Sequence, residues 1–284
     1  LNGVGNNVII GNGTLQTTAS FSSPRLFSLT GGATIDTTGT NLTLTGVISG
    51  SGSLTKQGTG TLSLLPQSPP LTPVPNTFTG NTNIVNGELA IQDDSALGSE
   101  INGHVTIASS TTSAVLTINM VPPGVPLPPN PVNLSSRSFT LLGASTLNIT
   151  SAVPPQTFTI TGTIGGSGSL IKAGDQALLL LGTNSYKGGT SIQNGILAGN
   201  TNSLQGDIEI QNTNPGTTLL FLQTSPGTYS GTLTGNGILQ IGNNSLTPFA
   251  LLTISGLSTD FHGPTNIFPT GSLNVTGSLI NSPV

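Results

Sequence analysis

The sequence predicts an all-β protein folded as a single parallel β-helix, or β-solenoid, of roughly 11–12 coils of about 23–24 residues each. Three observations lead there. Glycine contributes 39 of 284 residues, and only 5% of the chain is charged. One stretch of sequence recurs along the chain, and apolar residues alternate with threonine, serine and asparagine inside it, as they do in β-strands.

The composition excludes several classes of protein. The chain has no cysteine, so disulfides and cysteine-ligated zinc are impossible. A nucleic-acid partner needs a basic patch, and the chain offers five basic residues, namely Arg25, Lys56, Arg137, Lys172 and Lys187. No apolar run is long enough for a transmembrane segment. Because the chain opens at Leu1 without a leader, we expect a segment of a longer exported precursor.

The repeat occurs in three copies. Their first halves are residues 45–56, 161–172 and 230–241, each built around Gly-x-Gly-x-Leu. The second halves follow at residues 78–89, 186–197 and, in degenerate form, 261–273. In the second copy Leu170, Leu178 and Tyr186 are evenly spaced, and the interval fits a strand of about five residues and a turn of about three.

Three such sides give a coil of about 24 residues, and stacking at about 4.8 Å gives a rod about 55 Å long. The interval from Lys172 to Ile241 predicts about three coils between the second and third copies. The interval from Lys56 to Lys172 predicts about five coils between the first and second copies.

The residues of the repeat have separate structural roles. Glycine permits the positive φ and tight approach that coil corners need, and Asn-Gly pairs mark turns. Leucine at alternate positions faces the core. The repeat positions that we assign to the scaffold are Gly52, Leu54, Lys56, Leu62, Gly80, Gly87, Gly168, Leu170, Lys172, Leu178, Tyr186, Gly188 and Gly195.

Two proline-rich stretches interrupt the pattern, at about residues 65–76 and 121–132. Proline cannot donate a ladder hydrogen bond, so both stretches must leave the sheet. Alignment of the copies shows that the first stretch adds eight residues. We interpret both as surface loops on one elongated domain over residues 1–284; the alternative is a flexible linker between two domains.

The repeat resembles the passenger-associated repeat of bacterial autotransporters. Residues 166–197 match best, with Lys172, Gly174, Leu178, Leu180, Asn184, Tyr186, Gly188, Thr190, Gly195 and Leu197 in place. Residues 50–89 match apart from their insertion and have Phe78 at the tyrosine position. The resemblance implies a right-handed parallel β-helix that is exported across the outer membrane and displayed or released. Passengers of this family are adhesins, aggregation factors or occasional enzymes.

Catalysis or metal binding on such a fold requires clustered carboxylates. The one local group is Asp93, Asp94 and Glu100, and adjacent strand residues would point to opposite faces. We therefore interpret this group as a solvated loop, with a weak calcium site and a catalytic pair as the alternatives. No catalytic residue, metal site or cofactor is predicted.

Lys56 and Lys172 share one repeat position, and Phe78, Tyr186 and Phe261 share another. We interpret the lysines as outward side chains that discourage edge pairing and aid solubility, with ligand contact as the alternative. For the aromatic residues we favour core or corner packing over stacking on sugars.

The functional hypothesis is a non-catalytic structural β-solenoid, extracellular or on the bacterial outer surface. Its low charge and open strand edges predict association end to end or laterally into filaments or a surface layer. The first alternative is an adhesin that binds glycans or proteins of a host or neighbouring cell. The second is a polysaccharide-degrading enzyme on the same fold.

Overall fold

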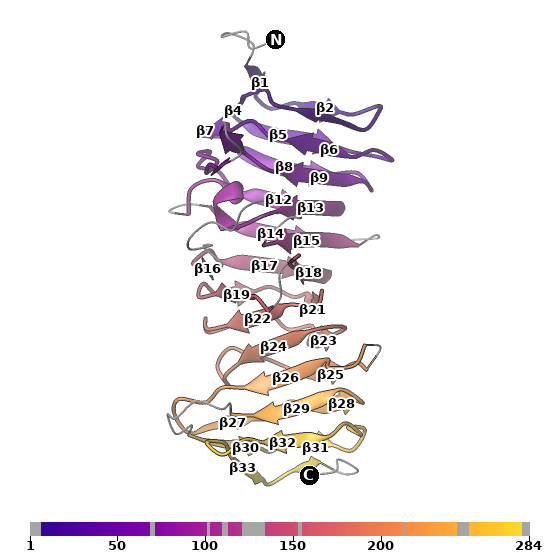
Figure 1. Ribbon diagram of the computed structural model, residues 1–284, viewed down its shortest axis with the longest axis vertical. Coiled ribbons are helices and arrows are strands. Elements are labelled where there is room, and N and C mark those ends of the chain that lie inside the picture. Colours follow the sequence, from indigo (N-terminus) through magenta and orange to yellow (C-terminus); the bar gives the residue numbers. More distant parts are fainter. Residues whose placement is uncertain are drawn as a thin grey trace.

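The structure is a computed structural model, and it describes residues 7–68, 72–100, 103–109, 113–120, 134–152, 155–212, 214–242 and 250–279. Figure 1 shows a rod of stacked strands that runs from β1 (Val8–Ile10) at one end to β33 (Ser272–Val275) near the other. No α-helix occurs in the described ranges, and the single 3-10 turn, η1 (Asp94–Leu97), is far too short to cross a membrane.

Two long parallel sheets, B and C, share the first half of the chain, and sheet C continues beyond it to residue 235. Sheet B contains β2 (Thr14–Gln16), β5 (Gly32–Asp36), β8 (Ser53–Gln57), β12 (Thr82–Ile84), β14 (Val105–Ala108), β17 (Phe139–Leu142) and β20 (Ile164–Gly165). Sheet C contains β3 (Phe21–Ser23), β6 (Leu42–Leu44), β9 (Thr61–Leu64), β13 (Gly87–Ile91), β15 (Ala114–Asn119), β18 (Ala144–Thr150), β21 (Ser169–Ala173), β23 (Thr190–Ile192), β25 (Ile208–Ile210) and β28 (Leu233–Gly235).

The remaining parallel sheets are shorter or confined to one end. Sheet A contains β1, β4 (Phe27–Leu29) and β7 (Ile48–Gly50). Sheet E contains β16 (Leu134–Ser135), β19 (Thr157–Ile160), β22 (Ala177–Leu180), β24 (Ile196–Gly199), β26 (Thr218–Phe221), β29 (Ile238–Ile241) and β32 (Thr265–Ile267). Sheet F contains β27 (Gly227–Tyr229), β30 (Leu251–Ile254) and β33, and sheet G contains β31 (Leu257–Ser258) and β34 (Ser278–Leu279).

In several turns the chain visits three sheets in order, whereas β22 to β26 alternate between sheets E and C. Strands β4, β5 and β6 lie in sheets A, B and C, and β7, β8 and β9 repeat that order. Further along, β19, β20, β21 and β22 lie in sheets E, B, C and E, so sheet E takes the place of sheet A. The prediction of a parallel β-solenoid is therefore confirmed, with about 11 turns.

The proline-rich insertion of the first copy changes the length of one turn without changing its register. Leu170 pairs with Thr190 in the next turn, and the equivalent Leu54 pairs with the equivalent Thr82 across a longer connection. The extra length is the eight residues that the sequence alignment assigned to the insertion. Part of it forms a small antiparallel hairpin, sheet D, of β10 (Gln67–Ser68) and β11 (Thr72–Pro73). The second proline-rich stretch lies outside the described residues.

The repeat copies do not lie directly above one another. Four steps of strand pairing lead from Leu54 through sheet B to Ile164, and Leu170 lies on the next side, in sheet C. The interval between the first two lysines is thus four turns and one side, and the prediction of five coils is wrong. The third copy advances again, because Leu239 lies in sheet E, three turns and one side beyond Leu170. The strict repeat spacing failed because turns differ in length.

Inward residues stack from turn to turn into one narrow core. Leu42, Leu62, Leu89, Leu116 and Leu147 stand in a single row and are at most 1% exposed. Burial of such side chains contributes about 1.5–3 kcal/mol each. The next member of this row is Lys172, and Lys56 likewise stands between Ile35 and Ile84 in sheet B.

Two of the predicted glycine roles are visible at the corners. Gly87 and Gly195 have φ of +66° and +67°, the left-handed region that L side chains avoid. A Cβ at Gly52 or Gly168 would lie 2.2 Å from the carbonyl oxygen of Gly31 or Gly143 in the turn before. Consecutive turns can approach this closely at the corner because both positions lack a side chain.

Candidate functional site

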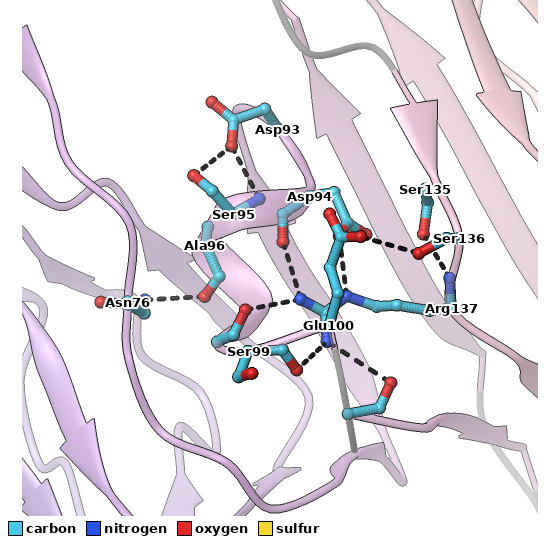
Figure 2. A network of polar contacts seen from close by, with 12 residues as sticks. Asn76, Asp93, Asp94, Ser95, Ala96, Ser99, Glu100, Ser135, Ser136 and Arg137 are labelled. Atoms are coloured by element: carbon cyan, nitrogen blue, oxygen red, sulfur yellow. Dashed lines mark hydrogen bonds and ion pairs between the residues drawn. The ribbon is translucent and has the colours of Figure 1, made fainter.

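The predicted acidic group is a structural network (Figure 2). Asp93 caps η1, since its Oδ1 accepts hydrogen bonds from the Ser95 amide at 2.8 Å and the Ser95 hydroxyl at 2.5 Å. Glu100 is exposed and accepts a bond from the Ser136 hydroxyl at 2.7 Å. The three carboxylates do not converge, and the described residues contain no group of three potential metal ligands.

Asp94 is fully buried and is paired with Arg137, so its interpretation as part of a solvated loop is wrong. Arg137 Nε donates to Asp94 Oδ2 at 2.8 Å. The guanidinium also donates to the carbonyl oxygens of Gly98, Ser99 and Asp94 at 2.6, 3.0 and 3.3 Å. Burial raises the pKa of Asp94 to about 6, and the charge of Arg137 opposes that rise. The pair fixes the loop after β13 against a residue 43 positions later.

The repeat lysines do not point outward; both are fully buried. Lys172 Nζ donates to the carbonyl oxygens of Ala173, Gly174 and Asn194 at 2.8, 2.8 and 2.9 Å. Lys56 Nζ makes the same three contacts, to Gln57, Gly58 and Asn86 at 3.0, 2.7 and 3.0 Å. All three N–H donors of each ammonium are therefore used, and the third acceptor belongs to the next turn.

The inward lysine was readable from the sequence. Leu54 and Lys56 are two residues apart on one strand, as are Leu170 and Lys172, so each pair faces the same side. We interpreted both lysines as outward because charged side chains are seldom buried, and so did not apply the strand parity to them. Burial lowers the pKa of Lys172 to about 7 and that of Lys56 to about 8, and nearby carboxylates oppose the shift.

Asn76 and Asn184 form a second link between turns, which the sequence reasoning missed. Asn184 Oδ1 accepts from the Ile164 amide in the turn before, and Nδ2 donates to the Ser203 carbonyl in the turn after, at 2.8 and 2.7 Å. Asn76 repeats both contacts at the same distances, with Ile48 and Ala96. The sequence does contain a signal for this link, because in both copies an asparagine stands two residues before the repeat aromatic residue.

Packing of the repeat aromatics in the core is confirmed. Phe78, Tyr186 and Phe261 are at most 3% exposed, so none can stack on a sugar. Tyr186 hydroxyl lies 2.8 Å from the Thr190 hydroxyl. Phe78 has no such group, and the hydroxyl of the equivalent Thr82 is buried without a hydrogen-bond partner.

Burial of Lys56, Lys172 and Arg137 leaves the outer surface more acidic than the sequence indicates. Of five basic side chains, only Arg25 and Lys187 are exposed. Of nine acidic side chains, only Asp94 is buried. The solvent-facing balance is therefore eight carboxylates against two cations, and the lysines do not serve solubility as predicted.

One outward row crosses most of sheet C and passes two hollows. From β9 to β28 the row consists of Thr61, Glu88, Val115, Thr146, Ile171, Ser191, Glu209 and Thr234. A hollow of about 270 Å³ surrounds Glu88, and one of about 540 Å³ surrounds Glu209 and includes Lys187 and Asp207 on its rim.

Both row carboxylates are held by neighbouring donors. Glu88 accepts bonds from the Thr61 and Thr117 hydroxyls at 2.9 and 2.5 Å. Glu209 accepts bonds from the Ser191 hydroxyl and the Gln211 amide, both at 3.2 Å. These contacts fix the carboxylates while leaving further lone pairs toward solvent.

The other two sides carry different chemistry. The outward row of sheet B is uncharged and rich in threonine, with Thr14, Thr34, Thr55, Asn83, Thr106 and Thr140 in register. The strands of sheet E contain no charged residue, and their outward positions include Leu179, Ile196, Leu220 and Ile238. Between sheets B and C, the outward charges are thus concentrated on sheet C. The exception is Asp36, at the end of β5 in sheet B.

Comparison with known proteins agrees with this architecture. The passenger-associated-transport-repeat matches residues 54–91 and 170–198, the two copies that contain the buried lysines. The chain thus has the repeats and the parallel fold of an autotransporter passenger, as its sequence resemblance implied.

A particular relative is the adhesin BmaC autotransporter of Brucella suis biovar 1 (strain 1330). It is 31% identical over 197 residues, which cover 66% of this chain but 5% of the adhesin. This chain is therefore a distant homologue of a small part of that protein. No solved structure matches the chain significantly.

Proposed function

We propose that this chain is a non-catalytic adhesive segment of an autotransporter passenger, displayed at the bacterial surface or released from it. Its solenoid holds the outer face of sheet C toward a ligand on a host or neighbouring cell. The observation that carries the proposal is the row of sheet C, where two hollows lie on a ten-stranded surface in a homologue of an adhesin.

Adhesion of the purified chain, coated on beads, to cultured mammalian cells tests this function. The variant Val115→Arg/Ile171→Arg places two long side chains on the row of sheet C. Its matched control, Thr55→Arg/Thr106→Arg, adds the same charge to the row of sheet B. We expect cell binding to be lost in the first variant and kept in the control. No binding by the wild-type chain, or equal binding by both variants, would contradict the proposal.

The absence of catalysis has its own support and test. Asp94 forms a buried salt bridge with Arg137, and Asp93 caps η1, so neither is placed to act on a substrate. We expect no turnover of common glycans. Turnover that disappears in Asp94→Asn or Glu100→Gln would overturn this part of the proposal.

Lateral association is a second candidate function. The outward aliphatic residues of sheet E favour it, because Leu179, Leu220 and the 52% exposed Leu181 form an uncharged face that a second copy can cover. Sedimentation of the wild type at high micromolar concentration should show oligomers that Leu179→Glu/Leu220→Glu removes. A wild-type monomer would contradict it. End-to-end association stays a prediction.

A further inference from the structure

The outer surface carries charge of one sign, which restricts the ligands that it can bind. Eight carboxylates face solvent, and the two exposed cations, Arg25 and Lys187, lie far apart in the sequence. Polyanions such as sulfated glycans need several cations close together to replace their counterions. No side of the described rod supplies such a group, so the charge balance favours an uncharged or positively charged ligand.

The two hollows of sheet C share one feature, although the larger one is also lined by Lys187 and Asp207, whose opposite charges leave its net charge negative. In each, a glutamate stands in the outward row and accepts bonds from neighbouring hydroxyl or amide donors. An ionised carboxylate accepts about four hydrogen bonds, and two are already made at Glu88 and at Glu209. Each carboxylate therefore presents unused acceptor positions to the hollow, and these suit ammonium or hydroxyl donors.

The row also sets the shape of the ligand. Five steps of strand pairing separate Glu88 from Glu209. At about 4.8 Å for each step the carboxylates are about 24 Å apart along the rod. The row residues between them are short or apolar and bear no charge, namely Val115, Thr146, Ile171 and Ser191. One extended chain lying along the solenoid axis can reach both hollows without crossing a charged barrier.

We infer that the row of sheet C binds a linear polysaccharide that carries free amino groups, with Glu88 and Glu209 as the two acceptor sites. The inference rests on the adhesive function proposed above and names its ligand class. Paired ammonium–carboxylate hydrogen bonds supply the contacts at each end. Between them, the part-exposed side chains of Val115 and Ile171 offer apolar contact to the faces of the sugar rings, and Ser191 offers a hydroxyl.

Isothermal titration of the intact chain with three glycans tests the inference. The probes are a chitosan oligosaccharide with free amines, the N-acetylated chitin oligosaccharide of equal length, and heparin. We expect binding of chitosan, weaker binding of the acetylated oligomer and none of heparin. Chitosan affinity should fall by about tenfold or more in Glu88→Gln/Glu209→Gln.

A matched control separates the site from general attraction between opposite charges. The variant Asp175→Asn/Asp260→Asn removes two exposed carboxylates that lie outside the row, and it should bind chitosan as the wild type does. Equal weakening in both double variants, or preferential binding of heparin, would overturn the inference. Cell adhesion without chitosan binding would leave the adhesive function standing and refute this ligand class alone.

Discussion

The second and third copies of the repeat show how one sequence pattern can lose its links between turns. In the second copy, Lys172 and Asn184 both connect one turn with the next. In the third copy, Ile241 occupies the lysine position in the core row and is 2% exposed. Ser258 takes part of the role of the asparagine, since its hydroxyl accepts the Leu233 amide at 2.9 Å. The comparison shows that the apolar core alone continues the fold, while the polar links are additional.

The first and second copies, by contrast, are nearly the same in their polar contacts. The lysine contacts are 2.7–3.0 Å long in the first copy and 2.8–2.9 Å long in the second, although the two copies lie on different sides of the rod. The links therefore belong to the repeat itself, not to a particular sheet. The differences among the three copies can be tested one link at a time.

Removal of the lysine link should have the largest effect. Lys172→Met keeps the aliphatic stem but removes three buried hydrogen bonds to carbonyl oxygens, and we expect the free energy of unfolding to fall by about 3 kcal/mol. Lys56→Met should behave alike. The control Lys187→Met alters an exposed lysine and should stay within about 0.5 kcal/mol of the wild type. Urea denaturation followed by circular dichroism measures all three; equal stability of Lys172→Met and Lys187→Met would contradict the role of the link.

The asparagine link should contribute somewhat less. Asn184→Ala removes two buried hydrogen bonds to different turns, which predicts a loss of about 2 kcal/mol. Ser258→Ala removes the single bond of the third copy and should lose about 1 kcal/mol. Urea denaturation midpoints of the two variants compare these losses. A larger loss in Ser258→Ala than in Asn184→Ala would contradict the prediction that the asparagine link is the stronger one.

The pH dependence follows from the lowered pKa of Lys172. Its pKa is about 7 in the folded chain and 10.5 as the unperturbed value. Between these values the unfolded chain binds more protons, so the free energy of unfolding rises with pH. We expect the wild type to gain stability over Lys172→Met from pH 7 toward pH 10, by no more than about 1.4 kcal/mol per pH unit. A difference that is flat over this range would show that the folded ammonium keeps its ordinary pKa.

The smallest effect concerns the aromatic position, where the first two copies differ. Phe78→Tyr supplies a hydroxyl to the unpartnered hydroxyl of Thr82 and should raise stability by about 1 kcal/mol. The reciprocal Tyr186→Phe removes the bond to Thr190 and should lower it by a similar amount. Thermal unfolding of the two variants side by side measures both signs. Destabilisation by Phe78→Tyr would mean that the core there has no room for the hydroxyl.

Much of the fold was predictable because it depends on local periodicity. Alternation of apolar and polar residues placed the strands, and the repeat fixed their parallel stacking. Even the eight-residue insertion was correct, since equivalent residues still pair across it. The number of turns between the first two copies was predicted wrongly, because it depends on the length of each turn and on loops outside the repeat.

The site was less accessible to sequence reasoning. The residues of the row of sheet C are far apart in the chain, and only strand register brings them into line. Asp94 and Arg137 are separated by 43 positions, and nothing near either one indicates the other. Lys56 and Lys172 were predicted to point outward because they are charged, although strand parity predicts that they point inward.

The sequence by itself determined that this protein is a parallel β-solenoid with repeated glycine corners and leucine rows, because both features depend on residues close together in the chain. Strand parity already places Lys56 and Lys172 inward, but only the tertiary structure decided which groups receive these buried charges. The corner carbonyls that receive Lys56 and Lys172 come from two consecutive turns, and they converge only after the second turn has stacked on the first. Burial of these cations depends on that stacking, and so does the acidic outer surface.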